Sequence, residues 1–94
     1  MKGEPLAPDD AKARIRSIIA DGHVTYSRHA QEEMAADGIS LVDAVNVLRG
    51  GVVRPAELER GTWRYRVQTG RLTVVIAFRS ESELAVVTAW RMRR

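Results

Sequence analysis

The stretch TWRYRVQTGRLTVVIAFRSESELAVVTAW, residues 62–90, decides the fold. It contains three runs rich in β-branched and aromatic residues, at 62–68, 72–78 and 84–90, separated by short polar turns. Two strands joined by a turn this short can pair only as antiparallel neighbours. The sequence therefore predicts a three-stranded antiparallel meander.

The chain before the meander has helical periodicity. Apolar residues recur at helical spacing, Gly22 and Gly38 mark helix ends, and Ser40 with Asp43 three residues later is typical of a helix start. The expected elements are helices over about 8–21, 28–37 and 40–48, and short strands at 23–27 and 52–54. The order α-β-α-α-β-β-β-β predicts an α+β fold with N-terminal helices packed on one face of a small antiparallel sheet.

Length and composition limit the classes of protein. A chain of 94 residues allows one domain, expected over 1–94, in which residues 1–8 look like a flexible arm because they contain three Pro or Gly. The absence of cysteine excludes a disulfide framework, a thiol nucleophile and a cysteine zinc site. No apolar run approaches the ~20 residues of a membrane span, and the start of the chain lacks the apolar region of a signal peptide. We expect a cytoplasmic protein with no membrane partner.

Positive charge is concentrated in the second half of the chain. The net charge is +3, but residues 1–47 carry −3 and residues 48–94 carry +6. Nearly all the cations are Arg, whose planar guanidinium suits phosphate and stacks on bases. RNA or DNA is therefore the first candidate partner. The alternative is codon bias, because many Ala and few Lys are typical of a GC-rich genome.

Strand 62–68 is the first place to look for an anion site. Its alternation places Arg64 and Arg66 on one face, about 7 Å apart, where they could clamp a phosphate. Arg79 and Arg91 lie on the neighbouring strands and could add to a basic face. The alternative is a solvated outer face with no ligand.

Two further candidates are a histidine and a hydroxyl. His29 follows strand 23–27 at a strand-to-helix junction, where it could act as a general base, or it could be a structural histidine bonded to a backbone carbonyl. Thr88 and Trp90 could offer a hydroxyl and a stacking ring to RNA, although a buried Trp is the common alternative. The two histidines lack metal-site spacing, and no glycine-rich phosphate loop is present.

The pattern Ser-x-His-Ala-x-x-x-Met at residues 27–34, together with RYRV at 64–67 and VTAW at 87–90, is familiar. It resembles a widespread family of small bacterial proteins known as a domain of unknown function, and the resemblance covers about residues 23–92. That family looks related to toxins of the RelE, BrnT and MqsR types. The resemblance implies a compact α+β ribonuclease fold like that of RelE.

The resemblance and the basic face together predict a metal-independent endoribonuclease toxin, which uses the RNA 2′-OH as nucleophile and needs no cofactor. Its expected partners are RNA and a cognate antitoxin encoded by the adjacent gene, for which the resemblance suggests a zinc-finger and helix-turn-helix organisation. The alternatives are a non-catalytic RNA- or DNA-binding module and a protein-interaction domain that uses the same basic face. The predicted catalytic residues are His29, Arg64 and Arg66, and the predicted substrate-binding residues are Ser27, Arg79, Thr88 and Arg91.

Overall fold

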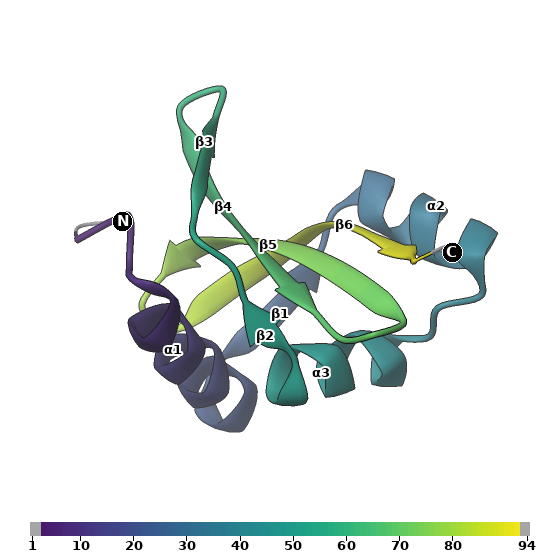
Figure 1. Ribbon diagram of the computed structural model, residues 1–94, viewed down its shortest axis with the longest axis horizontal. Helices are drawn as coiled ribbons and strands as arrows, with labels where there is room; N and C mark the ends of the chain where they lie inside the picture. The colour runs from purple at the N-terminus through teal and green to yellow at the C-terminus, as the bar shows by residue number, and fades with distance from the viewer. Residues whose placement is uncertain (1–2, 93–94) are drawn as a thin grey trace.

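The predicted meander forms the centre of the sheet in a computed structural model that describes residues 3–92 (Figure 1). Its strands are β4 (Thr62–Gln68), β5 (Leu72–Ser80) and β6 (Glu83–Arg91), each antiparallel to the next. The strands β5 and β6 are each slightly longer than predicted. The prediction of an antiparallel meander is confirmed.

Shorter strands extend the sheet at both edges. β1 (His23–Tyr26) pairs in parallel with β6, and β2 (Val52–Val53) pairs antiparallel with β4, giving the order β1-β6-β5-β4-β2. β3 (Glu57–Glu59), which the sequence analysis missed, pairs with the first half of β4. The two-residue turn between β3 and β4 has φ of +50° at Arg60 and +78° at Gly61, as a type I′ hairpin requires.

Three helices precede the meander, as predicted: α1 (Pro8–Asp21), α2 (Arg28–Asp37) and α3 (Leu41–Gly50). Helices α1 and α3 lie on one face of the sheet, as expected, whereas α2 lies along its β6 edge (Figure 1). No helix among residues 3–92 is both long and apolar enough to cross a membrane. All three helices contribute to a single apolar core with the inner side of β4, β5 and β6, which confirms the α+β class and the element order, with β3 as an additional strand. The largest of its fully buried side chains include Ile15, Ile18, Leu48, Tyr65, Val67, Val74, Ile76, Leu84 and Val86.

The helix ends follow the local sequence signals. Ser40 and Asp43 form a complete capping box at the start of α3. The hydrogen bonds that the Asp43 carboxylate makes with Ser40 hold its pKa below the ordinary value. Gly38 ends α2 in the left-handed conformation at φ +65°, where a side chain would be strained. These caps separate α2 from α3 over a very short connection.

A strand and a helix share the outer edge of β6, and this arrangement positions the site described below. β1 pairs with residues 83–86 of β6, which is only its first half. α2 continues beside the second half (Figure 1): the Ser27 hydroxyl donates to the Val87 carbonyl at 2.9 Å, and Arg91 Nε donates to the Asp37 carbonyl at 3.1 Å. A ten-residue helix is about 15 Å long and spans the rest of the strand.

The segment before α1 is anchored, in contrast to the flexible arm expected for residues 1–8. The buried Tyr65 hydroxyl donates to the Glu4 carboxylate at 3.0 Å and accepts a hydrogen bond from the Leu6 amide at 2.9 Å. Leu6 itself packs against the core. Burial is the main reason that the pKa of Tyr65 is raised to about 12. The start of the expected arm, residues 1–2, lies outside the described residues.

Candidate functional site

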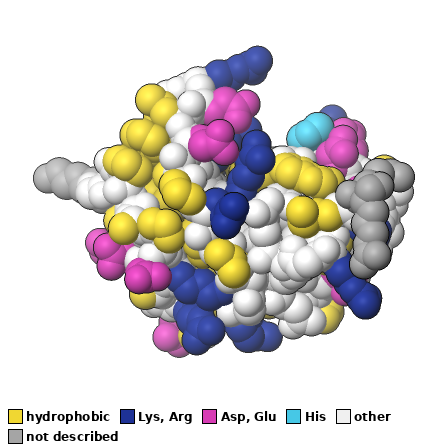
Figure 2. Space-filling view, in the orientation of Figure 1, with side chains coloured by type: hydrophobic (Ala, Val, Ile, Leu, Met, Phe, Trp, Pro, Cys, Tyr) yellow, Lys and Arg dark blue, Asp and Glu magenta, His cyan; other side chains and the backbone are white. Residues whose placement is uncertain are grey.

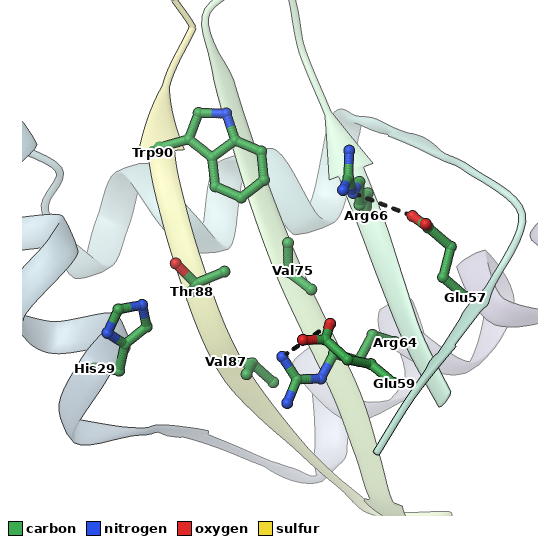
Figure 3. Close-up of a pocket in the computed structure, with 9 residues that line it drawn as sticks. All are labelled: His29, Glu57, Glu59, Arg64, Arg66, Val75, Val87, Thr88 and Trp90. Atoms are coloured by element: carbon green, nitrogen blue, oxygen red, sulfur yellow. Dashed lines mark ion pairs between the residues drawn. The ribbon is translucent and has the colours of Figure 1, made fainter. Parts of the chain in front are cut away.

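A cleft of about 270 Å³ lies on the face of the sheet turned away from the apolar core (Figure 3). The start of α2 forms one wall, and the β3–β4 hairpin forms the opposite wall. Strands β5 and β6 form the floor. The volume is near the lower end for ligand pockets, so the cleft suits a group no larger than about one nucleotide. The lining residues are His29, Glu57, Glu59, Arg64, Arg66, Val75, Val87, Thr88 and Trp90.

Four of the seven residues predicted for the site line this cleft, and three do not. His29, Arg64 and Arg66, the predicted catalytic residues, come together from elements far apart in the sequence, and Thr88 lies between them on the floor (Figure 3). The residues found elsewhere are Ser27, Arg79 and Arg91.

His29 points into the cleft from the first turn of α2 (Figure 3). Its side chain is 64% exposed, and its Nε2 lies 4.0 Å from a carboxylate oxygen of Glu33, one helical turn later. Within residues 3–92, no backbone carbonyl accepts a hydrogen bond from this imidazole, so the contact expected of a structural histidine is not made there. The imidazole is accessible to a ligand in the cleft.

The Ser-x-His-Ala-x-x-x-Met pattern has a structural explanation at every position except the histidine. Ser27 Oγ accepts a hydrogen bond from the Ala30 amide at 3.0 Å, which caps α2, and donates to the Val87 carbonyl. Ala30 and Met34 are buried one turn apart on the core side of the helix. His29 alone contributes neither a cap nor a buried contact. The fold therefore leaves this residue available for function.

A β-bulge shapes the floor of the cleft. Val75 of β5 pairs with Thr88, but its neighbour Ile76 pairs with Val86, so Val87 is an extra residue in β6. A bulged residue is left outside the regular ladder and bends its strand. Val87 and Thr88 both line the cleft as a result. The Ser27 hydroxyl satisfies the carbonyl of the extra residue, which ties the bulge to the start of α2.

The two arginines of β4 are held by anions from the chain itself. Arg64 Nη1 lies 3.4 Å from Glu59, and Arg66 Nε lies 3.3 Å from Glu57. The Arg66 guanidinium also lies over the Trp90 ring, 5.7 Å from its centroid, within the range of a cation–π contact. Glu57 and Glu59 therefore neutralise the positive charge of Arg64 and Arg66, the two arginines expected to begin a basic face.

Sequence reasoning missed Glu57 and Glu59 as site residues. They are spaced two apart directly before the Arg60-Gly61 turn, so strand alternation places them on one face of a hairpin. That signal is present in the sequence, but the sequence analysis assigned no element to the segment between strands 52–54 and 62–68. Figure 2 shows acidic and basic side chains interleaved over this hairpin.

Arg91 and Arg79 do not join the basic face that was predicted for them. The Arg91 side chain donates to the carbonyls of Asp37 and Gly38 at the end of α2, so its guanidinium has a structural role. Arg79 is exposed near the end of β5. The β4–β5 register stops at the pair Tyr65–Ile76, and beyond it the start of β4 belongs to the projecting β3–β4 hairpin (Figure 1). Arg79 therefore lies beyond the last pair and lines a separate hollow.

The described residues contain no group of three or more His, Cys, Asp or Glu side chains that could hold a metal ion.

No match is found among curated proteins or among solved structures. A family described as a domain of unknown function (DUF4258) matches residues 26–91, a span that includes every residue lining the cleft. The match covers well over half of the chain and confirms the resemblance to a domain of unknown function. The chain belongs to the DUF4258 family.

Proposed function

We propose that this protein is a metal-independent endoribonuclease that acts as the toxin of a toxin–antitoxin pair in the cytoplasm. The observation that carries the proposal is the cleft in which an accessible imidazole, His29, faces the guanidinium groups of Arg64 and Arg66. An imidazole can move a proton near neutral pH, and guanidinium groups stabilise negative charge on phosphate. RNA phosphodiester cleavage needs both functions.

The reaction would proceed by internal attack. The 2′-oxygen of the ribose forms a bond to phosphorus, the bond from phosphorus to the 5′-oxygen breaks, and the products are a 2′,3′-cyclic phosphate and a free 5′-hydroxyl. The proton of the 2′-hydroxyl must leave, and the 5′-oxygen must gain one. In this proposal His29 performs one of these two transfers. Arg64 and Arg66 stabilise the additional charge on the phosphorane.

Two floor residues would position the strand. Thr88 presents a hydroxyl between His29 and β5, and Trp90 presents an indole ring at one end of the cleft (Figure 3). An unpaired base can stack on an aromatic ring, whereas a paired base in a duplex cannot be reached in this way. The cleft therefore suits single-stranded RNA. The charge of +6 in residues 48–94 would attract its backbone.

The competing function is a non-catalytic nucleic-acid-binding module that uses the same arginines. The exposed imidazole favours catalysis, because a binding module needs no proton-transfer group in its cleft. The antitoxin partner, for which the resemblance suggests a zinc-finger and helix-turn-helix protein, remains part of the proposal.

Cleavage of a random-sequence RNA pool in the presence of EDTA tests this function. We expect products with cyclic phosphate ends. His29→Gln should lower the cleavage rate by about 10²–10⁴-fold while RNA affinity stays within a few-fold. His23→Gln is the matched control, because His23 is exposed on β1 outside the cleft, and it should cleave normally. Intact RNA with the wild-type protein, or full cleavage by His29→Gln, would contradict the proposed mechanism.

A further inference from the structure

The β3–β4 hairpin places two carboxylates on the two guanidinium groups of the proposed phosphate site. Glu57, Glu59, Arg64 and Arg66 lie on one face of the hairpin, because strand residues two apart point to the same side. Glu57 is directly opposite Arg64 in the register, yet each glutamate pairs with the arginine diagonally across from it. The two ion pairs therefore repeat the same diagonal register two residues apart.

The carboxylates occupy the groups that the proposed site offers to a phosphate. Carboxylate and phosphate oxygens are both anionic acceptors for the N–H groups of a guanidinium. We infer that β3 mimics a bound strand: Glu57 and Glu59 occupy the positions on Arg66 and Arg64 that phosphate oxygens take when single-stranded nucleic acid binds.

The ion pairs between the carboxylates and the arginines are weak. The contacts of 3.3 and 3.4 Å are longer than the ~2.7–2.9 Å of strong charge-assisted hydrogen bonds. Arg64 Nε is buried without a hydrogen-bond partner among the described residues, so Glu59 satisfies this guanidinium incompletely. The side chains of Glu57 and Glu59 are 66% and 58% exposed, and exposed ion pairs contribute little free energy. A phosphate can therefore replace either carboxylate at small cost.

The strand that carries the carboxylates is also weakly attached. β3 has three residues, all exposed, and within the described chain it pairs only with β4. Pro55 precedes it, and the hairpin projects away from the sheet (Figure 1). Segments with few buried contacts and exposed backbone hydrogen bonds open at low free energy. β3 can shift from the cleft without disturbing the core.

On this inference, nucleic acid binds by displacing the two glutamates from the guanidinium groups. In the free protein the glutamates neutralise the two guanidinium groups, which otherwise would repel each other across one narrow face. A strand that enters the cleft replaces Glu57 on Arg66 and Glu59 on Arg64. The inference rests on the proposed function for the nature of the ligand, and it adds that the affinity is limited by an internal competitor.

The test is the affinity for a single-stranded 2′-O-methyl oligonucleotide, which lacks the nucleophile and stays intact. Glu57→Gln and Glu59→Gln should each tighten binding by about 2- to 5-fold, the equivalent of one exposed ion pair. Glu81→Gln is the matched control, since Glu81 lies outside the cleft, is 84% exposed and pairs with Arg14 at 3.7 Å. It removes the same charge, and we expect a change below about 1.5-fold at physiological salt because of screening.

Each outcome decides the matter. Tighter binding by both cleft variants, beyond the effect of Glu81→Gln, supports the displacement. Equal effects at all three positions would mean that only the net charge of the protein matters, and would overturn the displacement. Weaker binding by the cleft variants, or no binding by any of the proteins, would also overturn it. Cleavage is measured separately, so a protein that binds in the expected pattern but leaves RNA intact keeps this inference and loses the proposed function.

Discussion

Replacing Ser27 by Ala removes a hydroxyl that makes two hydrogen bonds to the backbone: it accepts from the Ala30 amide in α2 and donates to the Val87 carbonyl in β6. The loss of the α2 cap should cost about 1 kcal/mol. The Val87 carbonyl, left without its donor at the bulge, should cost a further ~1–3 kcal/mol. We expect the free energy of unfolding to fall by about 2–4 kcal/mol, from a total of about 5–14 kcal/mol for a domain of this length.

Urea unfolding followed by circular dichroism measures this change. Ser40→Ala is the matched control, because Ser40 caps α3 but its hydroxyl has no second partner of this kind within residues 3–92, and it should cost about 1 kcal/mol. Ser27→Thr keeps the hydroxyl and should restore most of the stability. If Ser27→Ala costs no more than Ser40→Ala, the bond to Val87 does not stabilise the bulge, and the reasoning fails.

Two further predictions concern groups that the fold commits to structure. The raised pKa of Tyr65, about 12 against an ordinary 10.0, means that the folded state keeps a proton that the unfolded state loses. The contribution of Tyr65 to stability should therefore be full below pH 10 and be lost between pH 10 and 12, and a Tyr65→Phe variant followed by alkaline unfolding should lack that contribution. Arg91→Ala removes the side-chain bonds to the end of α2 and should cost about 1 kcal/mol in urea unfolding. It should leave RNA affinity within about 2-fold, and a large loss of affinity would restore Arg91 to the binding site.

Local patterns in the sequence predict most of the elements. Alternation in residues 62–90 gives the meander, and Gly22, Gly38 and Ser40 give helix boundaries. The parallel pairing of β1 with β6 could not be predicted, because it depends on partners far apart in the chain. β3 was missed for a related reason: two of its three residues are Glu, which has low strand propensity, and among the described strands it pairs with β4 alone.

The candidate site was predicted in part. Alternation correctly places Arg64 and Arg66 on the outer face. The same rule, applied from Trp90, would have assigned Arg91 to the opposite face. Arg79 obeys the alternation but falls beyond the last β4–β5 pair, and local alternation does not indicate where two strands stop pairing. The full set of residues that line the cleft can therefore be identified only from the three-dimensional register of the strands.

The parallel pairing of β1 with β6 has a consequence for how the protein is made. Ser27 bonds to Val87, 60 residues later in the chain, so the start of α2 has no docking site until β6 has been synthesised. Translation at about 5–20 residues per second gives a delay of about 3–12 s. During this interval the segment that carries His29 stays undocked, and the cleft cannot form in the nascent chain. Any activity that depends on the cleft therefore begins only after β6 has been synthesised and has left the ribosome.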